Sequence, residues 1–161
     1  MAFTLAAGCH ELGHLLVLAL LRKRIYGLSL GVFGAVIETA SLGYVEEAIC
    51  AAAGPVMNFL LFFFCLHNWF IFAFCNLVLL VYNLLPLYPL DGGRAFRALL
   101  LLLLPERVAM RCTHIVGMLV CGVILVTAIT MTTLYQCGIW PMFAAAIILW
   151  KIGRNTAGAS D

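Results

Sequence analysis

The chain has 161 residues, of which 65% are hydrophobic and only 10% are charged. A water-soluble domain of this length cannot bury so much apolar surface, because its surface-to-volume ratio is too high. The composition therefore excludes an ordinary soluble protein and predicts one integral membrane domain over residues 1–161, with no soluble domain. The formal net charge of +2 says little by itself, and we expect a lipid bilayer as the surroundings and no nucleic-acid partner.

Apolar segments that approach or exceed the roughly 20 residues needed to cross a bilayer as a helix recur along the chain. They predict an all-α membrane bundle of about five transmembrane helices, at about residues 2–21, 46–66, 69–90, 108–134 and 138–150. A short additional helix is expected at residues 95–104, ended by Pro105.

The segment at residues 25–44, after the first predicted helix, has a different pattern. It is rich in glycine and in β-forming residues, and Val32, Gly34 and Val36 alternate with other residues. This pattern predicts a small β-hairpin or a re-entrant strand pair. Such a backbone is tolerated at membrane depth only where protein or a water-filled cavity satisfies its polar groups.

The nine lysine and arginine residues are confined to four short regions of the chain. These regions are residues 22–24, 94–97, 107–111 and 151–154. Basic residues concentrate in cytoplasmic loops, so the first, third and fifth helices are predicted to end on the cytoplasmic side. The hairpin would then lie on that side and the N-terminus on the other.

The motif HELGH near the start of the chain contains three residues that suit a zinc site. His10 and His14 are four residues apart, so on a helix both imidazoles share one face and can reach one zinc ion. Glu11 can hold a water molecule at the metal and act as a general base. HExxH can arise by chance in a soluble helix, but each of these residues is costly in an apolar span, which favours the zinc interpretation.

A catalytic zinc site needs a third protein ligand and one open position. Asp91, within the sequence NLLPLYPLDGGR, is the strongest candidate. Pro86 and Pro89 before it and two glycines after it suggest a broken helix end that directs a carboxylate inward. The alternative is a simple turn at the membrane surface, since aspartate and glycine favour turns.

Three motifs together resemble the site-2 protease (M50) family of intramembrane zinc metalloproteases, over most of the chain from about Cys9 to Arg97. They are HELGH, AAAGPVMN at residues 51–58 and NLLPLYPLDGGR at residues 83–94. HExxH alone is moderately specific, whereas its combination with NxxPxxPLDGG is very specific. The glycine-rich segment before AGPxxN is most similar to the branch found in spore-forming bacteria, whose members process a sigma-factor precursor during sporulation.

The resemblance implies a role for each motif residue. His10, His14 and Asp91 would ligate one Zn²⁺ per chain, and Glu11 would be the catalytic base. Asn83 would lie by the active site and help to bind substrate or the oxyanion, which makes it a second catalytic candidate.

The resemblance leaves the role of the middle motif open. Asn58 would lie near the site, either as a helix-packing residue hydrogen-bonded across spans or as a participant in catalysis. The hairpin at residues 25–44 would hold substrate by strand addition. Family members usually carry a further transmembrane helix before HExxH, whereas only nine residues precede His10 here, so we expect either a truncated start or a reduced form.

The function implied by the resemblance is regulated intramembrane proteolysis. The substrate would be a membrane-associated protein, such as a sigma-factor precursor, and a regulatory membrane protein is a further expected partner. The chain would be a multi-pass protein of the bacterial cell membrane, with its active site toward the cytoplasm. Two rival functions are a membrane metal transporter, with His10, His14 and Asp91 as a transit site, and a catalytically inactive scaffold.

Overall fold

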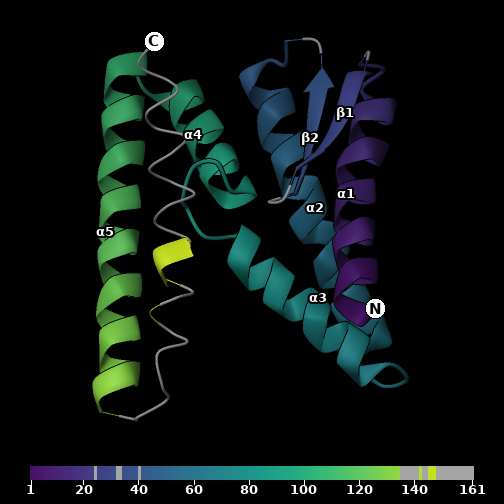
Figure 1. Cartoon of the computed structure of the whole chain (residues 1–161). Helices are drawn as coiled ribbons and strands as arrows, with labels where there is room; N and C mark the ends of the chain where they lie inside the picture. The colour runs from purple at the N-terminus through teal and green to yellow at the C-terminus, as the bar shows by residue number, and fades with distance from the viewer. Residues whose placement is uncertain (24, 32–33, 40, 135–141, 143–144, 148–161) are drawn as a thin grey trace.

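The computed structural model describes residues 1–23, 25–31, 34–39, 41–134, 142 and 145–147. Figure 1 shows the elements, which in chain order are α1 (Ala2–Leu20), β1 (Ile25–Gly31), β2 (Gly34–Thr39), α2 (Tyr44–Cys65), α3 (Phe70–Asn83), α4 (Asp91–Leu103) and α5 (Glu106–Thr133). The described part of the chain is thus mostly helical.

Three of these helices, α1, α2 and α5, are long and apolar enough to cross a membrane. They have 19, 22 and 28 residues, and their lengths suit an integral membrane protein. The helix predicted at 69–90 is shorter than expected, because α3 ends at Asn83 and Pro86 and Pro89 cannot continue it. The span predicted at 138–150 lies almost wholly outside the described residues.

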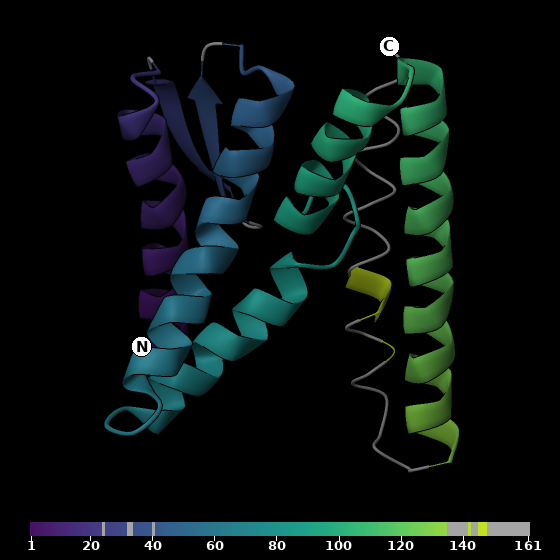
Figure 2. The ribbon, with the colours of Figure 1, turned by 180° about the vertical axis from the view of Figure 1, so that it is seen from behind.

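The helix α2 holds the bundle together, since it contacts α1, α3 and α4. Figures 1 and 2 show α3 crossing the lower ends of α1 and α2, and α5 standing apart from them beside α4. Gly13 brings α1 close to α2, because a Cβ added there would lie 2.8 Å from the Ala53 carbonyl oxygen. Small residues allow this close approach of membrane helices.

Two buried stripes face each other across the contact between α1 and α2. The stripe on α1 consists of Ala6, His10, Gly13, His14 and Leu18, and the stripe on α2 consists of Cys50, Ala51, Gly54, Pro55 and Asn58. Both follow the three- and four-residue spacing of one helix face. Ala6 also belongs to a small apolar core with Phe72 and Leu79 of α3. Both histidines are buried in the contact between the helices.

The strands β1 and β2 pair antiparallel, with Ile25 opposite Thr39 and Gly31 opposite Gly34. Two strands therefore occupy the segment where the sequence predicts a hairpin. In both views they lie alongside the C-terminal half of α1 and the N-terminal half of α2 (Figures 1 and 2).

The start of α2 is stabilised by local contacts. The Glu46 carboxylate accepts a hydrogen bond of 2.9 Å from the Gly43 backbone amide, as in a capping box. The same carboxylate lies 2.7 Å from the Lys23 ammonium group. Lys23 follows α1, so this ion pair joins the end of α1 to the beginning of α2.

Candidate metal centre

His10, His14 and Asp91 meet in the interior of the bundle. Their exposed fractions are 6%, 6% and 8%. Oδ2 of Asp91 lies 2.9 Å from Nε2 of His10 and 3.2 Å from Nε2 of His14, and the two Nε2 atoms are 3.2 Å apart. The structure thus brings together the three residues that the sequence singles out as metal ligands, and their ligand atoms all lie within 4.8 Å of one another.

Asp91 reaches the histidines because the chain breaks and folds back between α3 and α4. It is the first residue of α4 and is buried. A Cβ at Gly92 would overlap the Leu84 carbonyl group, and one at Gly93 would overlap the Leu87 carbonyl group. The two glycines therefore let residues 84–90 lie directly on the first turn of α4. The alternative of a surface turn at Leu-Asp-Gly-Gly is wrong, since the carboxylate begins a helix inside the protein.

Residues of α2 contact the two imidazole rings at Nδ1, the ring nitrogen that does not face Asp91. Nδ1 of His14 lies 2.8 Å from the carbonyl oxygen of Cys50, and Nδ1 of His10 lies 3.2 Å from Nδ2 of Asn58. Gly54 sits between these contacts, where a Cβ would overlap both rings. The sequence motif AGPxxN carries part of this signal, because residues 54 and 58 share one face of a helix, whereas no sequence pattern points to the backbone carbonyl of Cys50.

The donor set fits a zinc ion. Two imidazole nitrogens and one carboxylate are a typical ligand set of catalytic zinc, which keeps its fourth position open. The carbonyl of Cys50 only accepts hydrogen bonds, so Nδ1 of His14 carries the hydrogen and Nε2 presents its lone pair to the site. Hydrogen bonds of this kind orient histidine ligands in metal sites.

The outer oxygen of Asp91 faces a cation. Oδ1 lies 3.8 Å from Nη1 of Arg94, and Nε of Arg94 lies 3.9 Å from Oε1 of Glu47 at the start of α2. The carboxylate is thus oriented from both sides, with Oδ2 toward the histidines and Oδ1 toward the guanidinium group.

The other two predicted site residues, Glu11 and Asn83, lie on α1 and at the end of α3. Glu11 follows His10 on α1 and is partly exposed, and its carboxylate makes no hydrogen bond or ion pair with any residue that the structure describes. Asn83 is the last residue of α3, where its Nδ2 donates a hydrogen bond of 3.1 Å to the Leu79 carbonyl oxygen. Among the described residues the carboxylate of Glu11 therefore has no partner, whereas the amide of Asn83 has one within its own helix.

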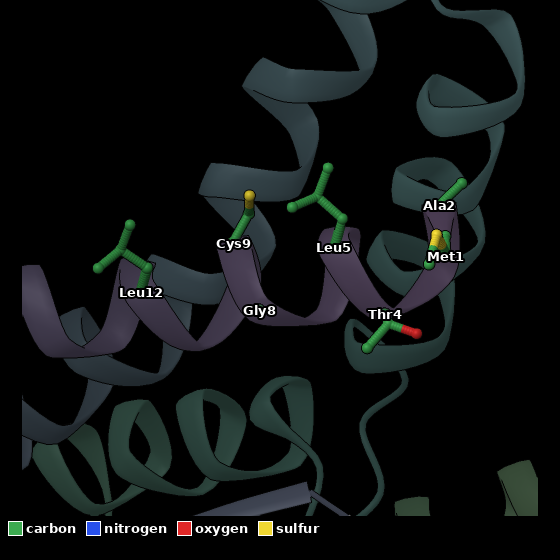
Figure 3. Close-up of a pocket in the computed structure, with 7 residues that line it drawn as sticks. All are labelled: Met1, Ala2, Thr4, Leu5, Gly8, Cys9 and Leu12. Carbon is green, nitrogen blue, oxygen red and sulfur yellow. The ribbon is translucent and has the colours of Figure 1, made fainter.

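A surface groove on α1 is distinct from this centre. It has a volume of about 780 Å³ and contains none of the predicted site residues; its lining residues, drawn in Figure 3, are Met1, Ala2, Thr4, Leu5, Gly8, Cys9 and Leu12. The groove is apolar and open, as a helix face toward lipid can be.

Comparison with known proteins gives three concordant findings. The family model "Peptidase family M50" matches residues 64–128, a segment that includes Asn83 and Asp91. Stage IV sporulation protein FB of Bacillus subtilis (strain 168) is 33% identical over 118 residues, which cover 65% of this chain and 40% of that protein. The chain thus spans well under half the length of this curated relative.

The fold also has a counterpart among solved structures. The site-2 protease from Methanocaldococcus jannaschii matches with a TM-score of 0.66 and 20% sequence identity, over 95% of this chain and 74% of that one. At this identity the similarity concerns the fold.

Proposed function

We propose that this chain, whose residues 64–128 match the model of peptidase family M50, is an intramembrane zinc metalloendopeptidase. Its substrate would be a protein with a peptide bond within or near a membrane-embedded segment. The observation that carries the proposal is the buried cluster of His10, His14 and Asp91 between apolar helices. Ionisable groups are costly in that setting and are retained mainly for function.

His10, His14 and Asp91 would hold one zinc ion through two Nε2 atoms and a carboxylate oxygen. Zinc bound there would act as a Lewis acid toward a peptide carbonyl and lower the pKa of a water molecule. Because all three side chains are held by neighbours, the site needs little reorganisation to accept the ion.

Glu11 would act as the general base and then as the general acid. Its carboxylate takes a proton from the attacking water, whose oxygen bonds to the carbonyl carbon. It then passes that proton to the leaving amine nitrogen as the C–N bond breaks. Its position next to His10 on α1 supports this role.

Asn83 would bind the substrate backbone or the oxyanion. A side-chain amide nitrogen carries two hydrogens, and the contact with Leu79 uses one of them. The second hydrogen remains for a substrate carbonyl oxygen. Asn83 also directly precedes the broken segment that leads to Asp91, which supports a place near the reacting bond.

The strands β1 and β2 would hold the substrate in an extended form. A transmembrane helix must unwind locally before its backbone can be cleaved, and a strand edge offers unpaired backbone groups for pairing with it. The basic residues that follow α1 and begin α4 support a cytoplasmic orientation of this end. A sigma-factor precursor is the proposed substrate, in keeping with the similarity to a sporulation protein.

Cleavage of such a substrate by the detergent-purified chain tests the proposal. We expect cleavage that stops with a zinc chelator and returns when zinc is added back. Zinc flux into vesicles that contain the chain, without any cleavage, would instead identify a transporter. Bound zinc with neither cleavage nor flux would identify an inactive scaffold.

A further inference from the structure

Asn58 lies on the side of His10 that faces away from the other ligands. It is fully buried in α2, and its Nδ2 lies 3.2 Å from Nδ1 of His10. The opposite ring nitrogen, Nε2, lies 2.9 Å from Oδ2 of Asp91. Asn58 therefore touches a ligand residue of the proposed site without touching the place of the metal itself.

The two histidines have different hydrogen-bond partners at Nδ1. Nδ1 of His14 donates to the Cys50 carbonyl oxygen, which leaves a lone pair on Nε2. Nδ1 of His10 instead lies against the Asn58 amide, which offers a donor in Nδ2 and an acceptor in Oδ1. A neutral histidine that ligates a metal through Nε2 carries its hydrogen on Nδ1, so each histidine needs an acceptor at that nitrogen, and the Cys50 carbonyl supplies it to His14.

We propose that Asn58 is a positioning residue for His10, which holds the imidazole through a hydrogen bond at Nδ1. A half-turn of the amide exchanges Nδ2 for Oδ1, which then accepts the hydrogen of Nδ1 when Nε2 faces a metal. Oδ1 is free to do so, since it is buried without a hydrogen-bond partner among the described residues. An amide can both donate and accept, which a carboxylate or an apolar side chain at residue 58 cannot.

The inference rests on the zinc site of the proposed function, but its test needs no proteolysis. Zinc affinity of the full, detergent-purified chain is measured by competition with a chelator for wild type, Asn58→Leu and Asn58→Asp. Leucine has a similar volume and removes every hydrogen bond. Aspartate is nearly isosteric and keeps the acceptor that the metal-bound form of His10 needs.

Asn76 provides the matched control. It is also fully buried, in α3, but its amide nitrogen donates to the Phe72 carbonyl oxygen of its own helix. Asn76→Leu therefore removes a buried amide of the same kind without changing a contact of a histidine.

We expect Asn58→Leu to bind zinc roughly 10- to 100-fold more weakly, as is usual when the hydrogen-bond partner of a metal ligand is lost. Asn58→Asp should bind at least as tightly as wild type, and Asn76→Leu should match wild type. With cobalt in place of zinc, the visible absorption spectrum should change in Asn58→Leu and remain unchanged in Asn76→Leu.

Zinc affinity of Asn58→Leu equal to that of wild type would overturn the inference and leave Asn58 as a packing residue. If the leucine variant does not fold, Asn58→Asp decides: wild-type affinity or better supports the role of an acceptor at Nδ1, and a loss of affinity overturns it. If wild type itself binds no zinc, the proposed function fails and this inference fails with it.

Discussion

Gly54 of α2 lies directly against His14 of α1, with no room for a side chain between them. A Cβ at residue 54 would overlap Nε2 of His14 and would lie 2.5 Å from Cε1 of His10. Such distances are shorter than any that real Cβ atoms adopt. Both imidazole rings therefore pack against the backbone of Gly54. Because Gly54 has no side chain, α2 lies close enough to α1 for Cys50 and Asn58 to contact Nδ1 of the two histidines.

The substitution Gly54→Ala should displace both rings and abolish zinc binding and cleavage. The helix itself should persist, because alanine in a helix interior is favoured over glycine by roughly 1 kcal/mol. Zinc content and helicity, from metal analysis and circular dichroism, check both statements. Gly8→Ala on α1 is the control, since a Cβ there meets nothing within 4 Å, and it should keep zinc and activity. A full equivalent of zinc in Gly54→Ala would contradict the prediction.

Asp91→Ala should lose zinc, because it removes the only carboxylate of the cluster and leaves two imidazoles. Wild type should become more stable with added zinc, by about 2.7 kcal/mol at a zinc concentration of 100 times the Kd. Thermal unfolding with and without zinc measures this. The rise should be absent in Asp91→Ala and present in Glu106→Ala, which removes an exposed carboxylate from the first turn of α5. A zinc-dependent rise of equal size in Asp91→Ala would exclude it as a ligand.

Glu11→Gln should separate metal binding from catalysis. Glutamine has nearly the same size as glutamate but cannot take a proton, so the variant should bind zinc like wild type. Cleavage should fall by roughly 10²- to 10⁴-fold, which is the usual contribution of a general base. Initial rates of substrate cleavage and zinc content are measured on the same preparation. Wild-type proteolysis by this variant would remove Glu11 from the mechanism.

The long apolar helices could be predicted, because one physical rule determines their length. The bilayer thickness requires about 20 apolar residues, and the boundaries predicted for α1, α2 and α5 agree with the structure to within two residues. The end of α3 could not be predicted as well. Leucines continue the apolar run through Leu90, so the run looks like a longer helix, although Pro86 and Pro89 end it earlier.

The candidate site could likewise be predicted from sequence only in part. His10 and His14 could be paired from sequence because their spacing is that of one helix turn, which is a local property. Asp91 lies 77 positions after His14, and only its prolines, its glycines and the family resemblance suggested that it joins them. The contact between Asn58 and His10 depends on how closely α1 and α2 approach each other, which no local pattern determines.

Gly93→Ala should lower the zinc affinity of the site, although Gly93 is not a metal ligand. A Cβ at residue 93 would overlap the Leu87 carbonyl carbon and lie 2.5 Å from the Leu87 carbonyl oxygen. These are backbone atoms, which cannot turn aside as a side chain can. Either the segment before α4 or the first turn of α4 must shift, and Asp91, two residues away, must move with it. We therefore expect zinc affinity to fall roughly tenfold or more, with helix content unchanged.

Gly117→Ala on α5 is the matched control for this prediction, because its Cβ would approach the same residue without a clash. That Cβ would lie 3.9 Å from Cδ2 of Leu87, which is an ordinary van der Waals contact. Zinc affinity by chelator competition and the rate of substrate cleavage should therefore be those of wild type. Equal zinc affinities of Gly93→Ala and Gly117→Ala would show that the position of Asp91 does not depend on the close approach of residues 84–90 to α4.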